Sequence, residues 1–173
     1  MPIEIFIFRL ACALTAGIII GTQRELKQRQ AGLTTNSLVA VGACIFILIS
    51  ESVIMRAQAA GGPVNNDNLR VLSQVVTGIG FLGAGVIMKN GLTIHGLSSA
   101  ATIWCSAAVG CLCGYGMWVE ALIAVTVIIL INWGLKSIEI YIKNIRHPKD
   151  EGDKAISALR SGPSETVVFW ERV

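Results

Sequence analysis

One uncharged run, Val75 to Met88, reads VVTGIGFLGAGVIM and holds four glycines. Its letters contain the pattern G-x-G-x-x-G, which occurs in dinucleotide-binding loops. Such a loop requires a preceding strand, a helix that opens within it, and an acidic residue about 20 positions further on. Here apolar residues enclose the glycines, and the later stretch Leu97–Ala101 reads LSSAA, without an acidic residue. The run therefore predicts a glycine-rich membrane helix, in which missing side chains let two backbones approach closely.

The composition agrees with a membrane protein. Of the 173 residues, 53% are hydrophobic and 14% are charged, against about 25% charged in an average soluble domain. A helix needs about 20 mostly apolar residues to span a bilayer. Five stretches qualify, and they predict an all-α membrane protein with five transmembrane helices: 3–22, 37–55, 71–88, 97–115 and 118–142. The first stretch contains Glu4 and Arg9 and lacks a small-residue cleavage site, so we do not expect a cleavable signal peptide.

These spans divide the chain into two parts. Residues 1–145 are predicted to form the five-span membrane domain. Residues 146–173 are polar and mixed in charge, and they contain Gly162-Pro163. Because such a composition is typical of disordered segments, we expect a flexible cytoplasmic tail there and no further folded domain.

The basic residues predict the orientation of the chain in the membrane. Those on one side lie in the first loop, after the third span and at the start of the tail: Arg24, Lys27, Arg29, Lys89, Lys136, Lys143, Arg146 and Lys149. The other side holds Arg56 and Arg70, beside Arg9 within the first span. The positive-inside rule then places the N-terminus outside and the C-terminus in the cytoplasm. The same residues account for a pI near 8.7, so no nucleic-acid partner is expected.

Small side chains mark one face of three predicted spans. In the first and fourth spans they recur every four residues, the spacing that aligns side chains on one helical face. The residues concerned are Gly17; Gly78, Gly80, Gly83 and Gly85; and Ser98, Thr102, Ser106 and Gly110. Such faces are typical of contacts between membrane helices, within one chain or between two copies. We expect the Gly-rich first, third and fourth spans to form a tight inner core, with the bulky fifth span outside it.

Arg9 lies about two turns into the first span, on the same face as Gly17. A charge inside a membrane is costly unless it is paired or hydrated, which makes it a candidate functional residue. The predicted topology brings four acidic residues to the same side: Glu4, Glu51, Asp67 and Glu120. Two interpretations follow. Arg9 forms a structural ion pair, most simply with Glu51, or it belongs to an outward-facing acidic cup that receives a cation. Because Mg²⁺ usually takes one or two carboxylates and keeps several waters, Asp67, Glu51 and Glu120 are candidate ligands.

The cysteines and histidines do not form a recognisable reactive or metal site. All five cysteines fall within predicted spans, where a free thiol behaves as a small hydrophobe, and His95 and His147 lie in separate loops. The spacing Cys111-x-Cys113 matches neither a redox pair nor a tetrahedral zinc site. We therefore expect no enzymatic activity, no cofactor and no disulfide.

Several segments carry a family resemblance. They read RL at 9–10 with GIIIGTQRE at 17–25, AGLTTNSLV at 31–39, Asp67-x-x-Arg70, QVVTGIGFLGAGVI at 74–87 and GLSSAATIW at 96–104. In this order they resemble the MgtC/SapB family of bacterial inner-membrane proteins, over about residues 4 to 135. With Glu25 and Arg70 from these segments, the candidate functional charges are Arg9, Glu25, Glu51, Asp67, Arg70 and Glu120.

The resemblance implies a virulence and stress protein that supports growth when magnesium is scarce, including inside host macrophages. It implies a place in the bacterial inner membrane and an action on membrane energetics, with the F-type ATP synthase or a small regulatory membrane peptide as partner. A second copy is a further possible partner, through the small-residue faces described above. Longer family members add a cytoplasmic ACT-like domain, which we do not expect in this chain. The alternative is a Mg²⁺ transporter or channel subunit, because Arg9 and the stripe Ser98, Thr102 and Ser106 would supply half of a polar route.

Overall fold

The structure is a computed structural model and describes residues 1–61, 68–91 and 93–135. These residues form five α-helices, a short β-hairpin and one π-helical turn. In chain order the elements are α1 (Ile3–Leu26), α2 (Leu33–Ala59), α3 (Asn68–Val86), β1 (Met88–Asn90), β2 (Thr93–His95), α4 (Leu97–Gly114), α5 (Trp118–Leu130) and η1 (Ile131–Leu135). All elements up to Leu130 belong to one compact unit, and η1 opens a second unit.

Four of these helices, α1 to α4, are long and apolar enough to cross a membrane. The 24 residues of α1 extend about 36 Å at about 1.5 Å per residue, against a hydrocarbon core of about 30 Å. The predicted class, an all-α membrane protein, is therefore confirmed. The fifth predicted span begins at Trp118 as expected, but α5 has 13 residues, or about 20 Å. The last part of that span, 136–142, and the predicted tail lie outside the described residues.

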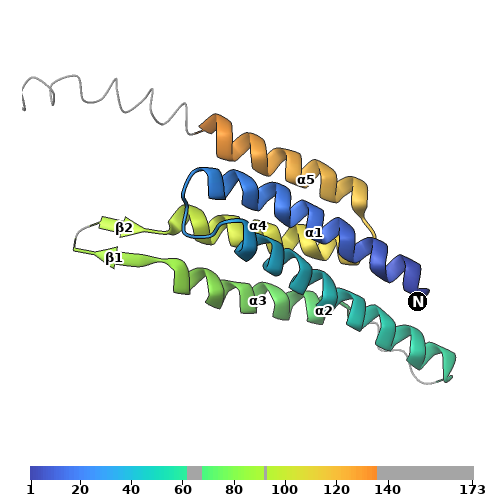
Figure 1. Ribbon diagram of the computed structural model, residues 1–173. Coiled ribbons are helices and arrows are strands. Elements are labelled where there is room, and N and C mark those ends of the chain that lie inside the picture. The colour runs from blue at the N-terminus through green and yellow to red at the C-terminus, as the bar shows by residue number, and fades with distance from the viewer. Residues whose placement is uncertain (62–67, 92, 136–173) are drawn as a thin grey trace, which may run out of the picture. The chain divides into compact units, whose positions relative to one another are not determined.

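Helices α1, α2 and α4 form the centre of the first unit (Figure 1). α2 packs along both α1 and α4, α5 packs on α1 and α4, and α3 packs on α4 and to a smaller extent on α2. The largest fully buried apolar side chains come from the three central helices: Ile20, Ile47, Leu48, Ile103 and Val109. On α5, by contrast, Leu122 and Ile123 are exposed, which agrees with the prediction that this helix lies outside the core.

Glycines of α1 and α4 bring these helices against the backbone of α2. A Cβ atom on Gly17 would lie 2.6 Å from the Cα atom of Ser37. A Cβ atom on Gly110 would overlap the carbonyl group of Ala40. Since non-bonded carbon atoms prefer separations of about 3.5–4.0 Å, these two contacts require glycine. The prediction that Gly17 and Gly110 mediate contacts between helices is thus confirmed.

The predicted inner core is wrong in one member, because α2 and not α3 lies at its centre. Cβ atoms added to Gly78, Gly80 and Gly85 of α3 would meet no atom within 4 Å. One added to Gly83 would lie 3.6 Å from the Cβ atom of Ala100, an ordinary contact. A close approach needs glycine on one helix and an opposing backbone on the other, and α2 supplies that backbone. Gly78, Gly80 and Gly85 remain open within one chain, so their contact with a second copy stays a prediction.

A β-hairpin lies between α3 and α4, where the sequence predicts a simple loop. Its strands pair antiparallel, with Lys89 opposite Ile94 and Asn90 opposite Thr93. The turn begins with Asn90-Gly91, and Gly91 has a φ angle of 59°. Glycine adopts a positive φ angle without strain, so Gly91 suits the turn that follows β1.

The connections between helices gather at two ends of the first unit (Figure 1). One end, which we call the basic end, holds the α1–α2 loop with Lys27 and Arg29 and the hairpin with Lys89. The opposite end holds the N-terminus and the short connection between α4 and α5. The positive-inside rule predicts that the basic end lies in the cytoplasm.

Cysteine labelling in a background without native cysteines would test this orientation. We expect Asp67→Cys to react with an impermeant reagent from outside the cell. Arg29→Cys and Lys149→Cys are expected to react only after the membrane is opened. Labelling of Lys149→Cys from outside would mean an even number of spans and would reverse the predicted position of the C-terminus.

Candidate functional site

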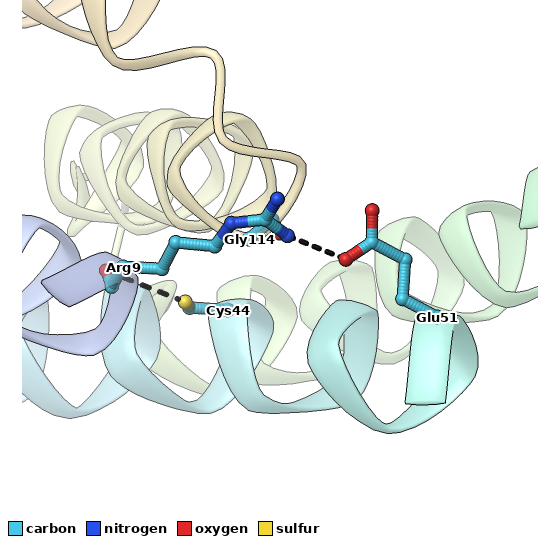
Figure 2. Close-up of polar contacts among 4 residues, drawn as sticks. All are labelled: Arg9, Cys44, Glu51 and Gly114. Carbon is cyan, nitrogen blue, oxygen red and sulfur yellow. Dashed lines mark hydrogen bonds and ion pairs between the residues drawn. The ribbon is translucent and has the colours of Figure 1, made fainter. Parts of the chain in front are cut away.

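The first candidate site joins Arg9 of α1 to Glu51 of α2. The Nη1 group of Arg9 donates hydrogen bonds to the Glu51 carboxylate and, at 2.7 Å, to the Gly114 carbonyl at the end of α4. Figure 2 shows the guanidinium pointing between the two partners, with the Cys44 thiol beneath the Arg9 backbone. The Arg9 and Glu51 side chains are 19% and 27% exposed. The ion pair predicted from the sequence is therefore confirmed, and it ties three helices together.

The surroundings of Arg9 hold its guanidinium in place. Gly116, with a φ angle of 76°, lies so close that a Cβ atom on it would come within 2.9 Å of Nη2. On the other side, Phe8 and Trp118 stack edge to face at 5.1 Å. Cavities of about 390 and 190 Å³ reach Arg9 from the sides of Glu4 and Glu51, respectively. The site is thus accessible from the opposite end while its central charge is paired.

The other predicted acidic residues do not gather around Arg9. Glu120 is exposed on the first turn of α5 and forms no ion pair with Arg9, so this part of the predicted cup is wrong. The reason is geometric, because the short connection after Gly114 brings Gly116 and Trp118 against Arg9 and leaves Glu120 outside. Asp67 lies outside the described residues, and its role as a ligand stays a prediction. Within the described ranges, no three His, Cys, Asp or Glu side chains come together as a metal site would require.

A second polar site lies at the basic end and was not predicted. Arg24 is only 3% exposed. Its Nη1 and Nη2 groups each donate a hydrogen bond of 2.9 Å, to the hydroxyls of Ser98 and Ser99 on the first turn of α4. From its position in the sequence, Arg24 is predicted to be one of the charges of the first loop. Its position three residues after Gly21, which is buried on the inner face of α1, was the signal that it points inward.

Between these two sites, Asn36 and Ser106 form a buried polar contact. The Ser106 hydroxyl donates to the Asn36 side-chain oxygen at 2.8 Å. The Asn36 amide donates to the carbonyls of Gly32, at 2.7 Å, and Ala31, at 3.1 Å. The Thr102 hydroxyl bonds to the backbone of its own helix. The polar stripe of α4 thus faces the bundle as predicted, and its hydroxyls are used for packing and for joining α4 to α2.

Glu25, the remaining candidate charge of this end, caps α2. Its carboxylate accepts a hydrogen bond of 3.0 Å from the Leu33 amide, the first residue of that helix. An acidic group at a helix N-terminus is electrostatically favourable. Arg70, the other candidate from the resembling segments, is exposed near the start of α3. The structure therefore assigns Glu25 a capping contact and leaves the role of Arg70 a prediction.

Comparison with known proteins identifies the family. The model of the MgtC family matches residues 10–141. The chain belongs to the MgtC family. Protein MgtC of Salmonella typhimurium is 46% identical over 127 residues, which are 73% of this chain and 51% of that protein. Protein MgtC of Brucella abortus is 48% identical over 123 residues, 71% and 48% of the two chains. The Synechocystis protein slr0014 is 41% identical over 140 residues, 80% and 55%. No solved structure matches the chain.

The family match confirms the resemblance seen in the sequence. The matched range covers all five α-helices apart from the first residues of α1, and it begins immediately after Arg9. The chain spans about half the length of the MgtC relatives it matches. The match therefore covers the membrane helices, the Arg24 site and Glu51, and it leaves Arg9 just outside.

Proposed function

We propose that the chain acts as a regulator in the bacterial inner membrane and has no enzymatic activity. In this proposal it supports growth when magnesium is scarce, and survival of a pathogen inside macrophages, by contacting a membrane partner. The expected partners are the F-type ATP synthase or a small regulatory membrane peptide. Membership of the MgtC family supports the physiological part. The mode of action rests on one structural observation, that the polar groups within the bundle are used to join its helices.

The polar contacts do not form a continuous route through the described bundle. Arg9 and Glu51 lie at the opposite end. The polar contacts of Arg24, Asn36 and Ser106 start at the basic end and extend into the bundle. Between them lie Ala13, Cys44 and Val109, which are 0–1% exposed. An ion crossing this layer would lose its hydration without gaining oxygen ligands, which is unfavourable for a hard cation. This layer favours a regulator over the alternative, a Mg²⁺ transporter or channel subunit.

Contact with a second copy or another membrane helix is placed at α3 in this proposal. An apolar groove of about 630 Å³ runs between α2 and α3, and Gly42 and Gly78 face it without close neighbours. Gln74, one turn before Gly78, is exposed. A side-chain amide within a membrane helix is stabilised by a hydrogen bond to another helix. The exposed amide beside an open glycine face therefore suits a homodimer better than a lipid-facing surface.

A flux assay separates regulation from transport. We expect purified protein in liposomes loaded with a magnesium-sensitive dye to show the same Mg²⁺ entry as empty liposomes. Entry that rises with the protein-to-lipid ratio, and that disappears when a larger side chain at Val109 blocks the buried layer, would support the transporter instead.

A growth assay tests the physiological role. In a strain that lacks its own family member, Asp67→Asn is expected to abolish rescue of growth at low magnesium while the protein level stays normal. Glu120→Gln is the matched control, because it removes an exposed carboxylate that does not contact Arg9, and we expect it to keep the rescue. Normal growth with Asp67→Asn at normal abundance would remove Asp67 from the functional residues.

A further inference from the structure

Within the described ranges, no carboxylate accepts a hydrogen bond from the N-terminus of α4, although helix N-termini often have such a partner. Its N-cap residue is Gly96, which has no side chain to cap the first turn. The amides of Leu97, Ser98 and Ser99 have no acceptor within the helix, because the first amides of any helix lack one. The partial positive charge of these amides attracts anions.

Instead of an anion, a buried cation faces this turn. The guanidinium of Arg24 contacts the Ser98 and Ser99 hydroxyls, and the residue is 3% exposed. Its Nε–H group is buried and has no hydrogen-bond partner among the described residues. A buried charge without a counter-charge is strongly unfavourable, and a cation at a helix N-terminus adds to this cost.

The neighbouring helix shows the usual arrangement at the same end of the bundle. There the Glu25 carboxylate accepts a hydrogen bond from the first amide of α2. Two consecutive residues of α1 thus contact the N-termini of two helices. Glu25 places a favourable negative charge at α2, whereas Arg24 places an unfavourable positive charge at α4. A second cation follows closely, since the backbone amide of Arg29 bonds to the Arg24 carbonyl.

We propose that a phosphate-type anion binds beside the contact between Arg24 and the first turn of α4. Among the described residues, the Arg24 Nε–H group and the first-turn amides are donors without partners. The Ser98 and Ser99 hydroxyls accept from Arg24, so each keeps its own proton to donate to the anion. Ser98 is exposed, which gives access from the membrane surface. The anion is either the phosphate of a lipid headgroup or free inorganic phosphate, and this inference does not depend on the proposed function.

The test measures the melting temperature of the purified protein in detergent. One arm compares sodium phosphate with sodium chloride at equal ionic strength. The other arm compares added phosphatidylglycerol with added phosphatidylcholine. We expect a rise of about 2–4 °C or more in at least one arm, since ligands that bind only the folded state stabilise it. A rise in the first arm alone identifies free phosphate, and a rise in the second alone identifies the lipid headgroup. No rise in either arm overturns the proposal.

Two variants show whether the effect comes from this site. Ser98→Asp places a carboxylate on the first turn of α4 beside Arg24, so it should raise the melting temperature without ligand and abolish the phosphate or lipid shift. Lys89→Gln removes an exposed charge at the same end and should keep the shift. A full shift in Ser98→Asp, or an equal loss of it in Lys89→Gln, would show that the anion binds elsewhere.

Discussion

Gly110→Leu is expected to abolish accumulation of folded protein, whereas Gly80→Leu is expected to leave the fold intact. A Cβ atom at position 110 would overlap the carbonyl group of Ala40, and at position 80 it would meet no atom within 4 Å. Overpacking of a core typically costs about 1–3 kcal/mol. The cost at Gly110 should lie at the upper end or above it, because the obstacle is a backbone group of α2 that cannot change its rotamer. Yield in detergent and the melting temperature measure the difference.

Two further variants make this comparison quantitative. Gly110→Ala adds only the Cβ atom and should lower the melting temperature less than Gly110→Leu does. Gly80→Leu should keep the melting temperature of the folded protein but convert a homodimer to monomer on size-exclusion chromatography, if α3 is the contact between copies. A Gly110→Leu protein as stable as the wild type would disprove the backbone contact between α2 and α4. An unchanged oligomer in Gly80→Leu would remove α3 from the dimer interface.

The sequence predicted where the helices lie along the chain better than it predicted which helices pack against each other. Apolar length located every α-helix, because crossing hydrocarbon demands long apolar runs whatever the helices then contact. The glycine pattern located the close contacts of Gly17 and Gly110. It did not show that α2 is their shared partner, because α2 contributes backbone at those points and a backbone contact leaves no mark in the sequence of the helix that supplies it.

The polar contacts were likewise predicted only where the sequence itself required a partner. Arg9 and Glu51 are charges near the same predicted membrane surface, and a charge there requires a partner, so their pairing followed from the sequence. Arg24 lies at the end of its span, where the positive-inside rule already explains a basic residue. The burial of its side chain was therefore not expected from the sequence. The position of Glu120 depended on the path of the α4–α5 connection, which is set by the left-handed residue Gly116. The proposed physiological role rests on family membership alone.

The ion pair at the opposite end is expected to contribute measurably to stability, and most clearly when only one partner is removed. Arg9→Leu would leave the Glu51 carboxylate half-buried without its partner and the Gly114 carbonyl without its donor. Losing a hydrogen bond to a charged group costs about 1.5–3 kcal/mol. Arg9→Leu and Glu51→Leu should therefore each lower the melting temperature. The double variant should be more stable than the sum of the single effects predicts, because it leaves no unpaired charge behind.

A double-mutant cycle isolates this interaction. Residues in direct contact usually couple by about 0.5–3 kcal/mol, and we expect Arg9 and Glu51 to fall in that range. Arg9→Lys keeps the charge but loses the planar guanidinium that reaches Glu51 and the Gly114 carbonyl together, so it should retain part of the stability. Glu120→Gln is the matched control and should change the stability equally in the wild type and in Arg9→Leu. Additive effects of Arg9→Leu and Glu51→Leu would mean that the pair does not stabilise the fold. A growth defect in Glu51→Gln at normal melting temperature and abundance would show that the carboxylate acts beyond its pairing with Arg9.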